Sequence, residues 1–357
     1  NPSFLAAILA ASENNGLEFS GLSGNEDDQV SQLWWKTAAI PQPSEEKPGL
    51  GKVIRQGFRN YLQLRAEPAG YTHLFTAGML ELVREKCLAR GLRELPFNQI
   101  TLLQNQFAVN FSNRSLLRRF ESESQSQESG VWWLEEVPAD LKPSLSDQVE
   151  LAIRSIFQQK ENCDFPVLLN ALYESFPGLM TPNLELLDFC LESYARPLPT
   201  HPETWQIREA ERIEARQADE TEALMMLKAS AERVGLESIT NPHEPASVEW
   251  HTRDGELVFK FFVQSHACIS RLVHHPDHLA DQGVIVFPGS RSNLLTYKIK
   301  KNYYLEELVN TGWHFLKFRT LRSICIRPEL TLVNWKELLD GDPPRWEQPQ
   351  QLSFFST

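Results

Sequence analysis

The chain has few cysteines and no long apolar run. Its 357 residues include five cysteines, scattered at Cys87, Cys163, Cys190, Cys268 and Cys325. No two of them form a Cys-x-x-Cys pair, so a structural zinc site is not expected and the thiols are predicted to be reduced core residues. No apolar stretch approaches the roughly 20 residues of a membrane-spanning helix, and no signal peptide opens the sequence. We therefore expect a cytoplasmic protein without a membrane partner.

Signatures of several enzyme classes are missing as well. There is no phosphate-binding P-loop, nucleophile elbow or glycine-rich methyl-donor loop. The segment Asp342-Pro343-Pro344-Arg345-Trp346 superficially resembles the Asp-Pro-Pro-Tyr loop of amino-group DNA methyltransferases, but Arg345 replaces the ring that would stack on a flipped base. The segment His274-His275-Pro276-Asp277-His278 offers metal ligands, yet adjacent histidines seldom point at one ion. We expect no catalytic residue, metal or cofactor in this chain; membership of a larger DNA methyltransferase stays open at this point.

Charge is abundant but uneven. The net charge of -12 argues against indiscriminate wrapping by nucleic acid. Acidic residues concentrate within 26–28, 45–46 and 203–222. Basic residues gather instead in the last folded segment, where contact with duplex DNA is most plausible on charge: Arg291, Lys298, Lys300, Lys301, Lys317, Arg319, Arg322 and Arg327.

The first 208 residues contain two similar arrangements of helices and strands. In residues 1–140, apolar periodicity predicts helices through 53–62 and from 72 to about 89, a helical patch at 115–120, and an aromatic strand at 130–134 after a polar stretch. In residues 141–208 a helix capped by Ser146, one opened by Pro166 and one started by Pro182-Asn183 precede a strand at 205–208. Helices followed by a polar hairpin are typical of a winged-helix module. We expect one such domain in each range.

Residues 209–330 show a third pattern. A helix at 220–234 leads to strands at 248–251 and 257–263, a short helix at 269–273, a strand at 283–287, a helix at 294–308 and a strand at 313–318. This α-β-β-α-β-α-β order resembles the core of the PD-(D/E)XK restriction-nuclease superfamily, in which acidic residues on the central strand hold magnesium. Gln264 stands where such an acid is needed. The resemblance therefore implies a degenerate nuclease domain; an active one would have to use Glu249, Asp254 or Glu256.

The predicted DNA contacts lie around the strand-to-helix turn Gly289-Ser290-Arg291-Ser292. Backbone N–H groups, hydroxyls and a guanidinium converge there as at a phosphate site, although a tight turn with a serine cap has the same sequence. The following lysines alternate with tyrosines, as on a nucleic-acid surface or on a solvated amphipathic helix. The predicted DNA-binding set is Gly289, Ser290, Arg291, Ser292, Lys298, Lys300, Lys301, Arg319 and Arg322.

Residues 331–357 are predicted to be an extended tail, because they are rich in proline and polar residues. The tail ends in Gln351-Leu352-Ser353-Phe354-Phe355, which resembles the bacterial sliding-clamp-binding pentapeptide except that Phe354 replaces leucine. The alternative is an apolar tail that folds back on its own domain. The predicted partner-binding residues are Gln351, Leu352, Phe354 and Phe355.

Three longer phrases, at 51–74, 176–182 and 315–318, look like the C-terminal region of large bacterial DNA methyltransferases from restriction or phage-defence systems. This resemblance implies DNA modification or defence, and it places no methyl-transfer site here. The helices and strands predicted along the chain indicate an α+β multidomain fold. The leading hypothesis is a non-catalytic, DNA-binding and assembly-forming part of such a complex. The alternatives are a subunit that docks partner proteins with little DNA contact, and an active metal-dependent nuclease.

Overall fold

The structure, a computed structural model, describes residues 49–88, 97–120, 126–138, 141–241, 246–273 and 282–340. It mixes helices with strands in three sheets, as expected for an α+β chain. Two compact units are present, Asn1–Leu64 with Pro68–Val137, and Arg65–Glu67 with Pro138–Thr357. No helix in the described residues is long and apolar enough to cross a membrane.

Several sequence predictions fall outside the described residues. They concern the histidine-rich loop at 274–278, the Asp-Pro-Pro segment from residue 342, and the tail residues Gln351, Leu352, Phe354 and Phe355. The interpretation of these segments stays a prediction.

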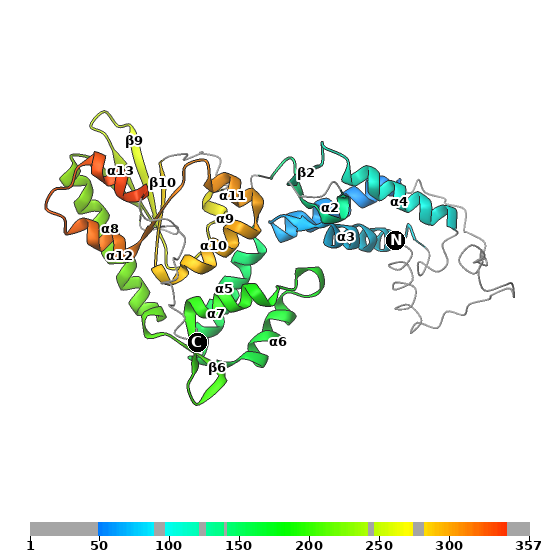
Figure 1. Cartoon of the computed structure of the whole chain (residues 1–357), viewed down its shortest axis with the longest axis horizontal. Helices are drawn as coiled ribbons and strands as arrows, with labels where there is room; N and C mark the ends of the chain where they lie inside the picture. The colour runs from blue at the N-terminus through cyan, green and yellow to red at the C-terminus, as the bar shows by residue number, and fades with distance from the viewer. Residues whose placement is uncertain are drawn as a thin grey trace, which may run out of the picture. The chain divides into compact units, whose positions relative to one another are not determined.

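From residue 49 onward, the described part of the first unit has the order α-β-α-α-β-β (Figure 1). Its elements are α2 (Leu50–Arg65), β1 (Ala69–Gly70), α3 (Tyr71–Arg84), α4 (Phe97–Phe111), β2 (Leu117–Phe120), the 3-10 turn η4 (Gln127–Ser129) and β3 (Val131–Leu134). The strands form an antiparallel sheet of order β1-β3-β2. The helical patch predicted at 115–120 is wrong, because Leu117 and Phe120 pair across the sheet with Leu134 and Val131.

The three helices of this unit meet around aromatic side chains. The Phe58 ring on α2 lies 4.8 Å from that of Phe111 and 6.0 Å from that of Phe107, both on α4. Gly78 on α3 allows this approach, because a Cβ there would stand 2.7 Å from the Phe107 ring. Apolar residues on one face of each helix thus form a core that leaves the other face of α4 outside.

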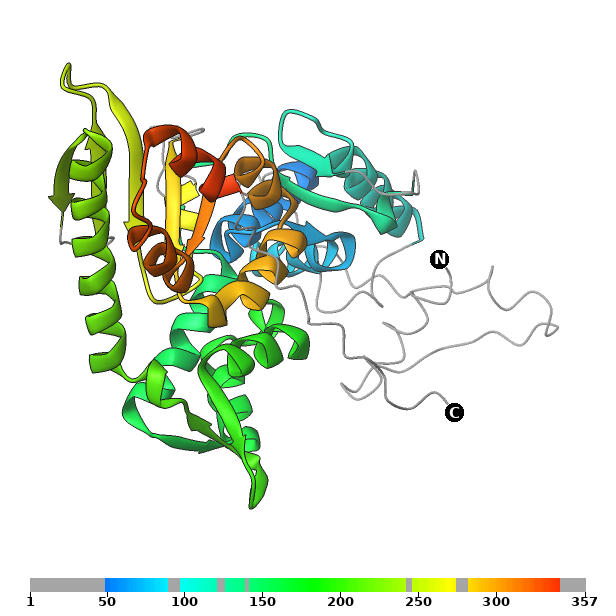
Figure 2. The same ribbon diagram turned by 60° about the vertical axis from the view of Figure 1, so that its left-hand side comes forward.

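The second unit begins with the same order of elements. They are α5 (Leu145–Gln159), β4 (Asn162–Asp164), α6 (Phe165–Ser175), the 3-10 turn η5 (Gly178–Met180), α7 (Leu184–Tyr194), β5 (Ala195–Leu198) and β6 (His201–Ile207). The sheet order β4-β6-β5 matches β1-β3-β2 in the first unit. Figure 2 shows the β5–β6 hairpin projecting away from the helices. Ser144, and not the predicted Ser146, caps α5 by accepting a hydrogen bond from the Asp147 amide.

A five-stranded sheet follows, with the order β11-β10-β9-β8-β7. Strands β7 (Glu237–Asn241), β8 (Ser247–His251) and β9 (Leu257–Val263) are antiparallel, whereas β9, β10 (Gly283–Phe287) and β11 (His314–Lys317) are parallel. Strand β7 was not predicted. The helices and turns that accompany the sheet are η6 (Glu209–Glu211), α8 (Ile213–Val234), α9 (Ser270–Val273), η7 (Gly289–Arg291), α10 (Ser292–Lys301), α11 (Tyr303–Val309), α12 (Phe318–Cys325) and α13 (Leu332–Asp340).

The two faces of this sheet bury alternate residues. Phe259 and Phe261 on β9 face a core with α8, α12 and α13, while Phe262 faces a core that also contains α10 and residues of α5, α6 and α7. Figures 1 and 2 show α8 on one side of the sheet and α10 on the other. Because one continuous core spans residues 145–315, the expected boundary at residue 208 does not separate two independent cores.

Two further predictions need correction. The helix predicted at 294–308 is two helices, because Asn302 leaves the helical conformation and its side chain caps α11 by accepting from the Leu305 amide at 3.0 Å. The tail predicted from residue 331 begins as helix α13, because Trp335 is fully buried and its ring lies 4.7 Å from that of Trp250. Burial of a tryptophan contributes several kcal/mol, about 3–5, which outweighs the polar character of its neighbours.

Candidate nucleic-acid interface

Arg291 was predicted to contact DNA, but in the structure it lies inside the protein. Its side chain is fully buried, pairs with Glu211 and donates to the Ser265 carbonyl oxygen at 3.0 Å. The guanidinium carbon also lies 3.6 Å from the centre of the Tyr194 ring. Burial would lower the pKa of Arg291, but Tyr194 and Glu211 outweigh it and raise this pKa. Arg291 is therefore a charged residue inside the protein that cannot reach a DNA phosphate in this conformation.

Lys298 is the second predicted contact that the structure buries. Its ammonium lies 2.7 Å from Asp147 Oδ1 and also contacts Glu150, both on α5, and it donates to the Ala267 carbonyl oxygen at 3.2 Å. Burial alone would lower the pKa of Lys298, but Asp147 and Glu150 raise it well above its usual value. Burial would raise the pKa of Glu150, but Lys298 and other neighbours lower it to about 2. Both groups are ionised, and the pair fastens α10 to α5.

The group of Asp147, Glu150 and Cys268 is, within the described residues, the set of side chains close enough together to hold a metal ion. The Lys298 ammonium already pairs with both of its carboxylates. Burial and Glu150 raise the pKa of the Cys268 thiol well above its usual value, so this thiol keeps its proton and is a poor ligand. The arrangement is an ion-pair cluster, in which Ser270 also donates to Asp147 at 2.6 Å.

The remaining members of the predicted DNA-binding set have different surroundings. Ser292 is buried, and Ser290 donates to Glu211 at 3.0 Å beside half-buried Gly289. Lys301 pairs with Glu185 at 3.2 Å, and Arg322 pairs with Asp219 and Glu222. Lys300 and Arg319 are exposed. The structure thus does not bring the nine residues together on one surface, and those that are exposed stay predicted DNA contacts.

The end of strand β9 carries no acidic cluster in the described residues. Gln264 is buried, and its amide donates to the His266 carbonyl oxygen at 3.1 Å. Glu249 lies 2.8 Å from Lys260 and 3.2 Å from His251. The hydrogen bond from Lys260 is the main cause that lowers the pKa of Glu249, so this carboxylate is ionised and paired. The other two candidates, Asp254 and Glu256, are exposed in the β8–β9 hairpin.

Helix α4, which the sequence did not lead us to expect, has an unusual exposed face. Its 15 residues contain no charged side chain. Leu103 and Phe107 turn inward, four residues apart. The amides of Gln104 and Asn105 are exposed and make no hydrogen bond within the part of the chain described above. The exposed residues in and just after α4 are Thr101, Leu102, Gln104, Asn105, Ala108, Val109 and Ser112.

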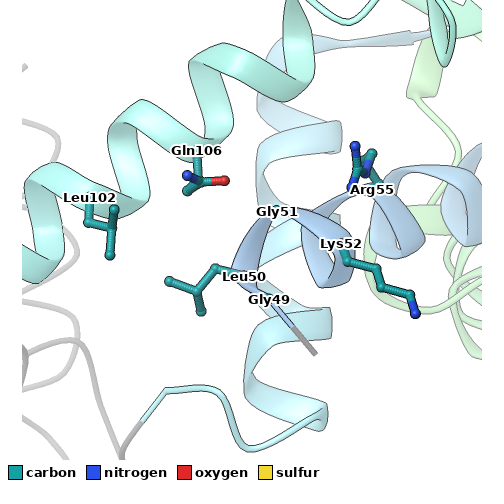
Figure 3. Close-up of a pocket in the computed structure, with 7 residues that line it drawn as sticks. All are labelled: Gly49, Leu50, Gly51, Lys52, Arg55, Leu102 and Gln106. Carbon is teal, nitrogen blue, oxygen red and sulfur yellow. The ribbon is translucent and has the colours of Figure 1, made fainter. Parts of the chain in front are cut away.

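Positive charge lies beside this face on α2. Lys52 and Arg55 are exposed, and they line an open pocket of about 420 Å³ together with Leu102 and Gln106 of α4 (Figure 3). Residue 51 is glycine, and a Cβ there would lie 2.6 Å from Gln106 Oε1, so the Gln106 side chain lies directly against this part of α2. The DNA-binding set predicted from the sequence does not include Lys52 or Arg55.

The β2–β3 hairpin borders the other end of α4. The Gln127 amide donates to Ser112 Oγ at 2.9 Å and so attaches η4 to the end of the helix. Arg114 and Arg118 are exposed just beyond α4. Glu128, also exposed, is the acidic residue among the described residues of this hairpin. Cations therefore flank a neutral helix face on both sides, and Glu128 is a carboxylate in the adjoining hairpin.

Helix α7 is the third helix of the second α-β-α-α-β-β unit, as α4 is of the first. Its exposed face is acidic, whereas that of α4 is uncharged. Its exposed polar residues are all acidic: Glu185, Asp188 and Glu192. The helix also packs against α10, where the Phe189 and Tyr297 rings lie 4.9 Å apart. We conclude that α7 serves an internal protein contact.

Comparisons with known proteins add nothing to the geometry described above. No family model matches this chain, and neither a curated protein nor a solved structure matches it.

Proposed function

We propose that this chain binds duplex DNA through the exposed face of α4 and forms the non-catalytic, assembly-forming part of a bacterial DNA modification or phage-defence complex. The observation that carries the proposal is the neutral, amide-bearing face of α4 with cations on either side. Phosphate contacts supply a large share of the affinity of DNA-binding proteins, and hydrogen bonds and apolar contacts to the base edges read the sequence.

The order of elements supports a winged-helix interpretation of both α-β-α-α-β-β units. In such a module the third helix enters the major groove and the hairpin lies beside it. In the first unit these parts are α4 and the β2–β3 hairpin.

A binding experiment with two matched triple variants tests the location. We expect Lys52→Ala/Arg55→Ala/Arg114→Ala to weaken binding of all duplex sequences and to lower the salt dependence by about one counterion per lost contact. Fluorescence anisotropy with a labelled duplex at several salt concentrations measures both quantities. The control, Lys300→Ala/Lys301→Ala/Arg319→Ala, removes the same charge from the surface predicted by sequence. If only the control lost affinity, the interface would lie there.

The second unit is assigned the assembly role. Helix α10 pairs with α5 through the Lys298 cluster and contacts α7 through the Tyr297 and Phe189 rings, so this module packs on the five-stranded sheet domain instead of exposing a reading helix. We propose that the sheet domain is a degenerate nuclease fold, in line with Gln264 and with the pairing of Glu249. Magnesium-dependent or manganese-dependent cleavage of plasmid DNA that is abolished by Glu249→Ala would contradict this part.

The alternative function is protein docking with little DNA contact, which the acidic net charge and the burial of Arg291 and Lys298 favour. Absence of duplex binding by the wild-type chain would select it. The proposed clamp partner of Gln351, Leu352, Phe354 and Phe355 is tested separately: deletion of residues 350–357 should abolish capture of purified sliding clamp and leave the melting temperature unchanged.

A further inference from the structure

The side chains on the exposed face of α4 indicate which base pairs this helix would contact. Each base pair shows a distinct set of donors and acceptors in the major groove, and side chains match them by geometry. Arginine and lysine read guanine, carboxylates accept from cytosine, and the amides of asparagine and glutamine bind adenine. Because α4 has no charged residue, it lacks the side chains for guanine and the carboxylates for cytosine.

The residues that α4 does expose suit adenine and thymine. The Gln104 and Asn105 amides are adjacent, exposed and unengaged within the described residues. An amide can donate to adenine N7 and accept from its N6 amino group at the same time. Val109, one helical turn beyond Asn105, is 63% exposed. An apolar side chain at this place is costly in water and is a good contact for the thymine methyl group.

We propose that α4 reads A·T base pairs in the major groove, with Gln104 and Asn105 on adenine and Val109 on the thymine methyl. This inference rests on the proposed DNA binding and adds the base preference to it. The flanking residues Lys52, Arg55 and Arg114 hold the helix on the phosphates without distinguishing sequences.

The test compares short duplexes that differ only in their central base pairs. Wild-type protein should bind an A·T-centred duplex about tenfold more tightly than a G·C-centred one, which is the expected size for one good amide contact. Replacing adenine by N6-methyladenine or 7-deazaadenine should remove much of that preference, because each change disrupts one of the two hydrogen bonds. Uracil in place of thymine should produce a smaller loss, because only a methyl contact is missing.

Protein variants separate base reading from DNA binding itself. Gln104→Ala/Asn105→Ala should bind both duplexes with nearly the same affinity as wild type binds the G·C duplex, and should keep its salt dependence. Gln217→Ala, at an exposed glutamine on α8, is the matched control and should behave like wild type. Circular dichroism checks that the variants fold.

The outcomes distinguish the two proposals. Equal wild-type affinity for both duplexes, or a preference that survives in Gln104→Ala/Asn105→Ala, would overturn the base assignment and leave DNA binding in place. No duplex binding at all would overturn both.

Discussion

The two α-β-α-α-β-β units of this chain share an order of elements and a sheet order, yet their third helices have opposite surroundings. Helix α4 has an uncharged exposed face, while α7 has acidic exposed residues and packs against α10. One topology therefore supplies a free helix in one place and an internal support in the other. The difference shows that function follows the side chains on the helix more closely than the order of elements.

The basic residues of the two units also differ in their surroundings. In the second unit, cations that looked like DNA contacts neutralise buried carboxylates; Arg291 pairs with Glu211, and Lys298 pairs with Asp147 and Glu150. In the first unit, Lys52, Arg55 and Arg114 remain exposed. Basic residues that cluster in the sequence can therefore contact DNA only where the fold leaves their side chains exposed.

The largest expected effect comes from breaking the internal support. Lys298→Ala leaves two carboxylates buried without their cation, so we expect it to lower the free energy of unfolding by about 3–5 kcal/mol. Urea denaturation followed by circular dichroism measures the change. Lys300→Ala, at an exposed position on the same helix, should cost less than about 0.5 kcal/mol. Equal effects of the two substitutions would show that the Lys298 cluster does not hold the unit together.

Acid should weaken the same support. The pKa of Glu150 is about 2 in the folded chain, against an ordinary value of 4.5. A carboxyl with a lowered folded pKa contributes stability above its unfolded pKa and loses it as pH falls, so about 3 kcal/mol should disappear between roughly pH 4.5 and 2. Urea titrations across this range measure it. Glu150→Gln should flatten the pH dependence, whereas Glu185→Gln, at an exposed carboxyl, should not; identical profiles would refute the assignment.

The smallest expected effect is on DNA affinity and comes from the β2–β3 hairpin beside α4. Glu128 places a negative charge near the proposed phosphate contacts, so Glu128→Gln should tighten duplex binding by about two- to threefold, most clearly at low salt. Asp188→Asn on α7 removes the same charge from the occupied helix and should leave binding unchanged. Anisotropy titrations compare the two variants. Tighter binding by Asp188→Asn alone would transfer the interface to the second unit.

Local sequence patterns predicted much of the secondary structure. Pro166 and Asn183 start α6 and α7 as expected, and the apolar runs at 257–263 and 283–287 are strands β9 and β10. The patterns failed where a distant partner decides the outcome. Residues 117–120 form a strand through pairing with β3, and the polar segment from 332 is a helix because Trp335 packs on Trp250.

Helix α4 was missed although a local signal exists. Leu103, Phe107 and Phe111 recur every four residues, and Pro96 stands just before the helix begins. The predicted DNA contacts instead include Lys298, Lys300 and Lys301, which cluster within four residues of the sequence.

The sequence by itself determined the periodicity of several helices, the starts of α6 and α7, and the positions of strands β8, β9, β10 and β11, because each depends on neighbouring residues. Only the tertiary structure decided which cations are outside. Two lysines one turn apart in sequence have the same intrinsic chemistry, but Lys298 and Lys301 differ once α10 lies on α5 and α7. Burial and pairing arise from contacts more than a hundred residues away, and these contacts convert an expected DNA surface into an internal support.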